Sequence, residues 1–293
     1  MVNPVHNLGP ELRWDFIEYS KESRSMYAKD RALRHFIKPI FNLEGNEYIL
    51  DVGCGIGTVG KLLGPLLRKD GNVIGIDQDI QLVNYGNKHW ARRPNMRLKV
   101  GDANKIEYPP LFFDIVASFG LLEFVSNPYH VITEMLRVLK HPGKLIVIHV
   151  DTLNYTVSPR NELLETIYRD LQKAMDFMGI DTGLTHFHAF CWKNRLPLEE
   201  FTYTMEYRVP ITQKYIEVAE MSMKSFYKKP SIVKEVIEFN YQFLKHIGWT
   251  KEKVTEFIEY QYTLTYHLAF LKEHIGEEFY KKLPIKVYRV QVI

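Results

Sequence analysis

The sequence has little cysteine, no long hydrophobic run and no low-complexity tract. Its two cysteines, Cys54 and Cys191, are too few for a disulfide framework, which fits a reducing compartment. No apolar stretch approaches the roughly 20 residues that a membrane-spanning helix needs. Residues 1–16 also lack the basic and then apolar pattern of a secretory signal. We therefore expect a cytoplasmic protein without a membrane partner.

An excess of one charge is also missing. The chain has 38 basic and 35 acidic residues, so its formal charge of +3 permits an anionic partner without requiring one. Hydrophobic residues make up 46% of the 293 residues, which is ample for a packed core. No internal repeat or flexible linker divides the sequence, so we expect any additional segments to pack onto one globular unit.

The most informative stretch that is present covers residues 49–60, ILDVGCGIGTVG, where an apolar strand leads to an acid and then to closely spaced glycines. Gly53, Gly55 and Gly57 have no Cβ, so the backbone can adopt positive φ and ligand atoms can approach its N–H groups. The pattern indicates a site for a nucleotide-type cofactor.

Two classes of cofactor fit this loop. Residues 55–60 satisfy the GxGxxG pattern of dinucleotide sites, and Asp77 follows at a suitable distance for a ribose hydroxyl. Two further acids favour another class: Asp51 precedes the glycines, and Asp102 follows the third predicted strand. Three carboxylates at three successive strand ends suit a cationic ligand with hydroxyl and amine groups better than they suit a pyrophosphate.

Residues 51–57, DVGCGIG, resemble the D/E-x-G-x-G-x-G loop of the class I S-adenosylmethionine-dependent methyltransferases. The resemblance covers residues 30–150 and includes the acid that ends the second strand segment (73–77), the Gly-Asp-Ala at 101–103 and the fourth strand segment (113–118). It implies an α/β fold with a Rossmann-like, doubly wound, seven-stranded and mostly parallel sheet.

The resemblance also implies how S-adenosylmethionine would bind. The glycine loop would pass under its methionine moiety, Asp77 would accept hydrogen bonds from both ribose hydroxyls, and Asp102 would accept one from the adenine amino group. Carboxylates only accept hydrogen bonds, so these donors are natural partners. Ile80 would line one face of adenine, and Ala103 would leave room for the ring edge. The complete set predicted to bind the cofactor is Asp51, Gly53, Cys54, Gly55, Gly57, Asp77, Gln78, Ile80, Asp102, Ala103 and Phe119.

Apolar strand segments alternate with helical stretches between residues 48 and 150. The predicted strands span 48–52, 73–77, 96–100, 113–119 and 144–150. Since the carboxyl ends of parallel strands share one edge, Asp51, Asp77, Asp102 and Ser118 should meet there. Taken singly, Asp77 and Asp102 fit a local role as helix N-caps or turn residues equally well.

The chain after Val150 is rich in aromatic residues and mostly helical in pattern. Helices are predicted over 160–178, 212–227, 231–247 and 251–274, and the sixth and seventh strands over 201–210 and 286–293. The predicted organisation is an N-terminal helical cap (1–40), a cofactor-binding core (41–210), a helical lid inserted before the last strand (211–284) and the final sheet strand (285–293).

Methyl transfer is an in-line displacement in which the leaving group becomes neutral, so positioning supplies most of the catalysis. A general base is needed only where the acceptor carries a proton. The candidates for such a base are Glu123, His149, His186 and His188. For each histidine, a buried ring with ordinary hydrogen bonds is the alternative. The spacing of His186, His188 and Cys191 matches no standard zinc module, so no metal site is predicted.

The leading hypothesis is a methyltransferase that acts on an oxygen, nitrogen or carbon atom of a small molecule enclosed under the lid. The alternative is an RNA base methyltransferase, because basic residues gather at 21–34, 88–97 and 224–229. However, residues 118–121 read SFGL, which is not the Asn/Asp-Pro-Pro-Tyr type of motif that many exocyclic-amine methyltransferases carry. A non-catalytic cofactor-binding protein is disfavoured by the intact acids and glycines.

Overall fold

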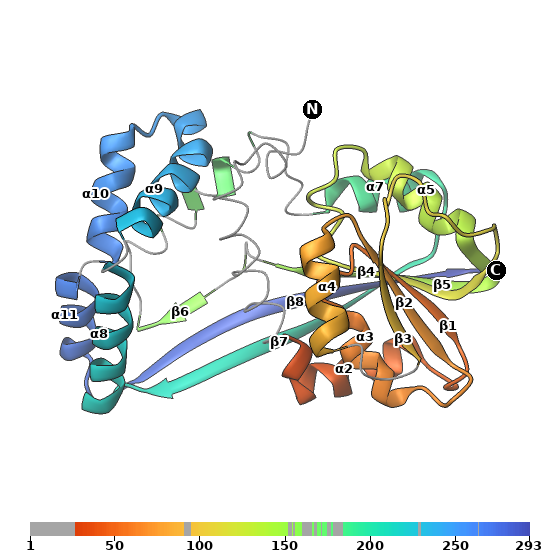
Figure 1. Ribbon diagram of the computed structural model, residues 1–293, viewed down its shortest axis with the longest axis horizontal. Helices are drawn as coiled ribbons and strands as arrows, with labels where there is room; N and C mark the ends of the chain where they lie inside the picture. The colour runs from red at the N-terminus through yellow and green to blue at the C-terminus, as the bar shows by residue number, and fades with distance from the viewer. Residues whose placement is uncertain are drawn as a thin grey trace. The chain divides into compact units, whose positions relative to one another are not determined.

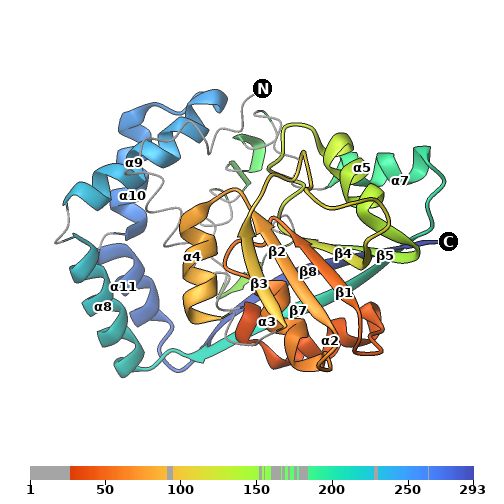
Figure 2. The ribbon, with the colours of Figure 1, turned by 45° about the vertical axis from the view of Figure 1, so that its right-hand side comes forward.

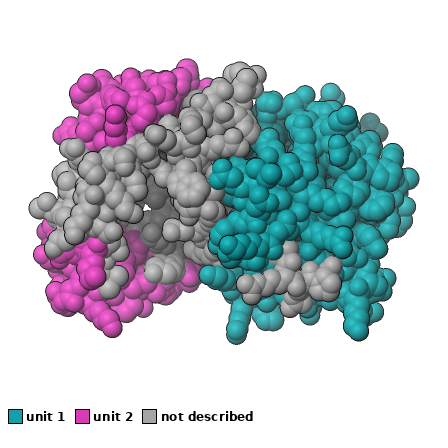
Figure 3. Space-filling view, in the orientation of Figure 1, with its two compact units in different colours: residues 1–151, 183–203, 284–293 teal, residues 152–182, 204–283 magenta. Residues whose placement is uncertain are grey.

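The computed structural model describes residues 27–90, 95–151, 154, 156–159, 166, 169–170, 172–174, 177, 184–227, 230–262 and 264–293. The chain divides into two compact units (Figure 3). Unit 1 contains Met1–Asp151, Gly183–Tyr203 and Pro284–Ile293, and unit 2 contains Thr152–Thr182 and Thr204–Leu283. Residues 1–26 of the predicted cap and most of the predicted helix 160–178 lie outside the described residues. The predicted division into cap, core and lid stays a prediction.

The central sheet has the strand order β3-β2-β1-β4-β5-β8, and β7 also pairs with β8 (Figure 1). Its strands are β1 (Tyr48–Val52), β2 (Asn72–Asp77), β3 (Met96–Val100), β4 (Phe113–Phe119), β5 (Leu139–Val150), β7 (Leu198–Pro210) and β8 (Glu278–Val292). The neighbouring pairs among β1–β5 are parallel, whereas β8 is antiparallel to β5. The predicted Rossmann-like, doubly wound and mostly parallel sheet is confirmed.

Strand boundaries differ from the prediction in the second half of the chain. A short strand, β6 (Thr156–Ser158), pairs with Tyr280–Lys282 of β8 and adds an eighth strand to the sheet of the described residues. Strand β8 begins at Glu278, inside the segment 211–284 that was predicted as a helical lid. Its first part forms a strand because β6 pairs with it there, before β5 pairs with it from Ile285 onward.

The helices of unit 1 cover the sheet on both sides. They are α2 (Arg31–Phe41), α3 (Thr58–Leu63), α4 (Ile80–His89), α5 (Pro128–Val138) and α7 (Thr185–Lys193), with the 3₁₀ turn η2 (Gly64–Leu66) after α3. Figures 1 and 2 show α5 and α7 on one side of the sheet and α2 and α3 on the other. The N-cap residues Asp79 of α4 and Asn127 of α5 accept hydrogen bonds from the first turns of their helices, which fixes where each helix begins.

The central strands are buried on both faces. In β1 all residues after Tyr48 are buried, and in β4 all residues except the half-buried Asp114 are buried. This continuous apolar pattern is typical of a parallel sheet that is covered on both faces. One large cluster joins these strands to α5 and α7 through Leu50, Val116, Leu145, Val147, Val131, Met135, Phe187, Phe190 and Cys191.

Unit 2 is built mainly from four helices in its described part. They are α8 (Gln213–Tyr227), α9 (Pro230–Leu244), α10 (Lys251–Tyr262) and α11 (Leu264–Glu273), and the 3₁₀ turn η4 (Lys245–Ile247) follows α9. Helix α9 packs on α10, and α8 packs on α11. The helical pattern predicted for 212–274 is therefore confirmed. Among the helices that the structure describes, none is both long and apolar enough to cross a bilayer.

Candidate functional site

The ends of β1, β2 and β3 place the three predicted acids on neighbouring strands. Asp51 is paired in register with Gly75 of β2, and Asp77 is paired with Val100 of β3. The Gly101 N–H donates to the carbonyl oxygen of Asp77 at 3.0 Å, which joins the segment that carries Asp102 to the end of β2. Asp51 is buried, Asp77 is half-buried and Asp102 is exposed. The three acids thus lie at or just after the carboxyl ends of three neighbouring strands, at one edge of the sheet.

The Asp77 carboxylate is held by two backbone donors. The Gly55 N–H donates to its Oδ2 at 2.8 Å, and the Asp79 N–H donates to its Oδ1 at 2.9 Å. These two bonds fix the orientation of the carboxylate. The carboxylate therefore has a defined direction at the end of β2.

The glycines of the loop all have left-handed backbone conformations, with φ of 68° at Gly53, 52° at Gly55 and 88° at Gly57. Their surroundings differ. A Cβ on Gly53 would lie 2.7 Å from Leu121 Cδ1, and a Cβ on Gly57 would lie 2.7 Å from Met96 Cε. A Cβ on Gly55 would have no heavy atom of the described residues within 4 Å. Among the described residues, Gly55 therefore has an open face, whereas the other two glycines allow close packing.

The Cys54 side chain is buried against Val83 and Leu98 rather than exposed in the loop. Burial raises the pKa of the Cys54 thiol well above its ordinary value, and the negative charges of Asp51 and Asp77 raise it further. The thiol therefore stays protonated and is a poor nucleophile. Because both carboxylates act on this thiol, both lie close to the glycine loop.

Two aliphatic side chains are exposed beside the acids. Ile80, the first residue of α4, is 57% exposed, and Val100, the last residue of β3, is 55% exposed. Together they give the strand ends an apolar surface next to Asp77. Ile80 was predicted from the sequence, whereas Val100 was not, because a final strand residue has no pattern that indicates exposure. Gln78 is also exposed, whereas Ala103 is half-buried and packs on the core.

Asp102 has the local turn role that its sequence position left open. Its Oδ1 accepts hydrogen bonds from the backbone N–H of Asn104 at 2.8 Å and from the Asn104 side-chain amide at 2.9 Å. These bonds orient the carboxylate, and a carboxylate can accept more than two. The local role of Asp102 is therefore compatible with ligand binding.

Phe119, the last residue of β4, is buried. Its ring centroid lies 5.2 Å from that of Tyr27, which is also buried. The two rings build an apolar surround at the carboxyl end of β4. Ser118, directly before Phe119, is fully buried as well.

Two of the four candidate bases form a pair. Glu123 lies just after β4 and His149 lies near the end of β5; both are buried, and Nδ1 of His149 is 3.3 Å from Oε1 of Glu123. Each residue was predicted from the sequence as a candidate base, but the contact between them was not. His186 and His188 lie on α7 instead, where His186 faces the ring of Tyr129 and His188 faces the ring of Tyr288.

The family comparison agrees with this geometry. The methyltransferase-domain family matches residues 43–206, which is more than half of the chain. The chain therefore belongs to this family of methyltransferase domains, which is of the class I S-adenosylmethionine-dependent type. S-adenosylmethionine is the cofactor of this class of methyltransferase.

Known relatives cover parts of the chain. The chain is 34% identical over 122 residues to the ubiquinone/menaquinone biosynthesis C-methyltransferase UbiE of Coxiella burnetii, a match that covers 40% of this chain and 48% of that protein. It is 31% identical over 137 residues to the demethylmenaquinone methyltransferase of Lactobacillus johnsonii, with 45% and 52% covered. The chain thus spans about half the length of the curated relatives it matches.

A solved structure resembles much of the fold. The crystal structure of protein BH2331 from Bacillus halodurans superposes with a TM-score of 0.51 at 16% identity, and the match covers 89% of this chain and 99% of that one. At this identity the likeness shows a shared fold alone.

Proposed function

We propose that this protein transfers the methyl group of S-adenosylmethionine to an oxygen, nitrogen or carbon atom of a small molecule. The observation that carries the proposal is the Asp77 carboxylate, which the Gly55 N–H holds beside the open face of that glycine. The small-molecule acceptor is supported by the names of the two curated relatives, a ubiquinone/menaquinone biosynthesis C-methyltransferase and a demethylmenaquinone methyltransferase.

Each part of the cofactor has a proposed partner in unit 1. The backbone at Gly55 would contact the methionine moiety, and Asp77 would accept from the ribose hydroxyls. Asp102 would accept from the adenine amino group. The exposed side chains of Ile80 and Val100 would cover apolar ring surface of adenine. The packing roles of Gly53 and Gly57 would keep this loop in place.

When bound, S-adenosylmethionine supplies an electrophilic methyl carbon whose leaving group is a neutral thioether. The protein therefore has no leaving group to protonate, and its main tasks are to orient the acceptor and exclude water. Where the acceptor carries a proton, we propose that the Glu123 and His149 pair takes it. An ionised Glu123 only accepts hydrogen bonds, so Nδ1 of His149 would carry the hydrogen and Nε2 would be the basic atom.

Replacement of His149 tests its proposed role as the general base. For a hydroxyl or ammonium acceptor, His149→Asn should lower kcat by about 10²-fold or more, because general-base catalysis typically contributes that much. His186→Asn, on α7, is the matched control and should change kcat less than about threefold. Equal losses in the two variants would contradict the assignment.

The substrate class is tested by transfer of a tritiated methyl group. Purified protein would be incubated with labelled S-adenosylmethionine and either a low-molecular-weight metabolite extract or total RNA. We expect label in the small-molecule fraction. Label in RNA alone, with transfer that falls steeply as salt rises, would overturn the small-molecule proposal in favour of an RNA acceptor. The role of residues 211–284 as a cover for the substrate stays a prediction.

A further inference from the structure

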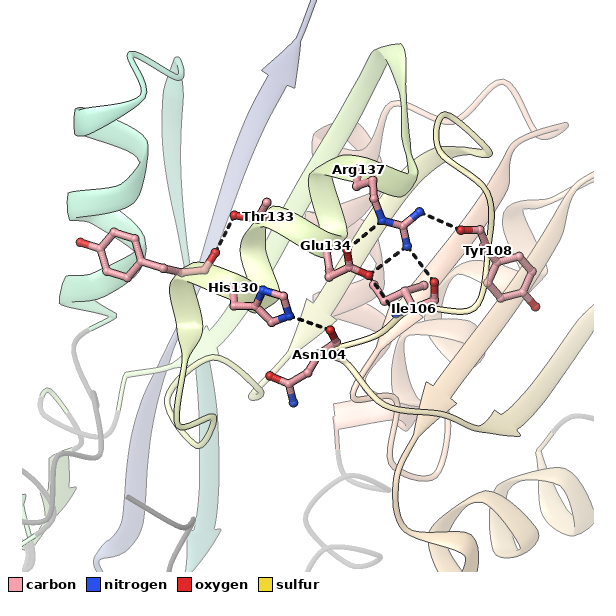
Figure 4. A network of polar contacts seen from close by, with 8 residues as sticks. Asn104, Ile106, Tyr108, His130, Thr133, Glu134 and Arg137 are labelled. Carbon is pink, nitrogen blue, oxygen red and sulfur yellow. Dashed lines mark hydrogen bonds and ion pairs between the residues drawn. The ribbon is translucent and has the colours of Figure 1, made fainter.

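The irregular segment after β3, residues 101–110, is joined to helix α5 by a network of polar side chains (Figure 4). Apart from an isolated bridge between Asp102 and Lys105, this segment has no regular backbone pairing of its own. Its position therefore depends on contacts with other parts of unit 1. Because the segment carries Asp102, those contacts bear on the proposed adenine site.

Arg137, at the end of α5, makes the central contacts of the network. Its Nη2 donates to the carbonyl oxygen of Ile106 at 2.8 Å, and its Nη1 donates to the carbonyl oxygen of Tyr108 at 2.9 Å. The same guanidinium donates to both carboxylate oxygens of Glu134, at 2.8 and 2.9 Å. A planar guanidinium can make several such bonds at fixed angles, which a lysine cannot reproduce.

Glu134 completes the hold on Ile106. Its Oε2 accepts from the Ile106 N–H at 3.0 Å, so side chains of α5 bond both backbone polar groups of this residue. The Ile106 side chain is buried in the same core cluster that receives α5. The bond from Arg137 lowers the pKa of Glu134, so the carboxylate stays ionised at neutral pH.

His130 extends the network to the acid itself. Its Nε2 lies 2.7 Å from the carbonyl oxygen of Asn104, and since a carbonyl only accepts, Nε2 carries the hydrogen. Asn104 in turn donates twice to Oδ1 of Asp102. His130, Glu134 and Arg137 are spaced at i, i+4 and i+7 on α5, so they lie on one face of the helix.

We infer that His130, Glu134 and Arg137 form a clamp that positions Asp102 to recognise the amino group of the adenine base. This inference rests on the proposed cofactor site. The three side chains are positioning residues, because they contact the backbone of the 104–108 segment and act on the ligand only through Asp102. At the ribose end, by contrast, backbone N–H groups orient Asp77. Substitution in the clamp should therefore change the preference for the base and leave ribose binding in place.

The test compares two ligands by calorimetry: S-adenosylhomocysteine and S-inosylhomocysteine, in which a carbonyl replaces the amino group. Wild-type protein should prefer the adenosyl compound. In Arg137→Gln, affinity for the adenosyl compound should fall about tenfold, which corresponds to one charge-assisted hydrogen bond, while affinity for the inosyl compound changes little. The readout is the ratio of the two affinities, which a general loss of stability would not change.

Lys140→Gln is the matched control. It removes another ion pair close to the end of α5, in which Lys140 Nζ lies 2.7 Å from Asp114 Oδ1, and neither residue contacts the 104–108 segment in the described contacts. It should leave the ratio of the two affinities unchanged.

Two further variants sharpen the test. Arg137→Lys keeps the positive charge but loses the planar guanidinium with its several donors. It should give a ratio between those of wild type and Arg137→Gln. If Arg137→Gln does not fold, Glu134→Gln gives the same comparison, and faster hydrogen exchange of the Ile106 amide would report the released segment.

The outcomes separate the two proposals. If wild-type protein binds neither ligand, the proposed function fails, and the clamp fails with it. If wild-type protein binds both ligands equally, Asp102 does not recognise the amino group, and the clamp does not position it for that purpose. If wild-type protein prefers the adenosyl compound and folded Arg137→Gln keeps that preference, the clamp alone is wrong.

Discussion

The glycine loop at 53–57 and the segment at 101–108 lie at the same edge of the sheet but are held in different ways. In the glycine loop, main-chain hydrogen bonds set the geometry: the Cys54 N–H donates to the carbonyl oxygen of Ile76, and the Gly57 N–H donates to that of Cys54. In the second segment, the bonds come from side chains of α5, more than 20 residues further along the chain.

This difference indicates that the two ends of the proposed cofactor site respond differently to substitution. Main-chain geometry changes only when a residue alters the backbone or fills the space beside it. A side-chain clamp changes whenever one of its members is replaced. We therefore expect the ribose end to be essential for binding and the adenine end to be the part that adjusts ligand preference.

The largest effect should come from Asp77→Ala. The variant removes the carboxylate that accepts from Gly55 and Asp79 and that would accept from both ribose hydroxyls. The free energy of S-adenosylmethionine binding should become less favourable by about 2 to 4 kcal/mol, the loss of two charge-assisted hydrogen bonds. Calorimetric titration measures this change, and unchanged affinity would contradict the ribose assignment.

Asp79→Ala is the matched control for that variant. The Asp79 side chain caps α4 by accepting from Gln81 and Leu82, and its backbone N–H still reaches Asp77 after the substitution. Loss of the cap should lower the free energy of unfolding by about 1 kcal/mol. Cofactor affinity should remain within about threefold of wild type, so a binding loss as large as that of Asp77→Ala would show that the cap rather than the carboxylate matters.

The next effect distinguishes two glycines of the same loop. Gly53→Ala should lower the free energy of unfolding by about 2 to 3 kcal/mol, for two reasons. Alanine is strained at the positive φ of this position, and its Cβ would lie 2.7 Å from the Leu121 side chain. Gly55→Ala should lower it by about 1 kcal/mol, because its φ is strained but its face is open.

For cofactor affinity we expect the opposite order: Gly55→Ala should weaken binding more than Gly53→Ala does. At Gly55 the new methyl group would occupy the face proposed for the ligand, whereas at Gly53 it would meet the packed Leu121 side chain. Thermal denaturation and calorimetry on the same samples measure both quantities. If Gly55→Ala bound S-adenosylmethionine as tightly as wild type, the open face would not be the ligand face.

The smallest effect concerns the pH dependence of the clamp. The pKa of Glu134 is lowered from its ordinary value of 4.5, chiefly because Arg137 donates a hydrogen bond to it. A carboxylate with a lowered pKa in the folded state stabilises the protein above its ordinary pKa and loses that contribution as the pH falls through the folded value.

Wild-type protein should therefore lose stability faster than Glu134→Gln as the pH falls below about 4.5. The difference in unfolding free energy should be about 1 kcal/mol or less, because the side chain of Arg137 is one-third exposed. Denaturant unfolding at several pH values measures it. Parallel pH profiles for the two proteins would show that this ion pair contributes nothing to stability.

Local sequence patterns predicted the parts of the fold that local chemistry determines. The strands at 48–52 and 96–100 were placed at their observed bounds, because the first is a mostly apolar run, the second alternates apolar and basic residues, and turn residues follow each. The start of β8 at Glu278 was missed, since residues 278–285 form a strand only where a partner strand pairs with them. Strand structure depends on the neighbour as well as on the residues themselves.

Contacts between residues far apart in the sequence could not be predicted either. Glu123 and His149 were each proposed as a base, but 26 residues separate them and no periodicity relates them. Glu134 and Arg137 are close enough in sequence to predict an ion pair on one helix face. Their hydrogen bonds to the backbone of Ile106 and Tyr108 could not be predicted from the sequence, because nearly every residue carries the same backbone N–H and C=O groups.

The sequence by itself determined the class of fold, the glycine loop and the acid at each of three strand ends, because hydrophobic periodicity and the conformational freedom of glycine are local properties. Only the tertiary structure decided which glycine is open, which buried side chains meet and what fixes Asp102. Those features depend on distances between residues far apart in the chain, and they exist only once the strands and helices have packed.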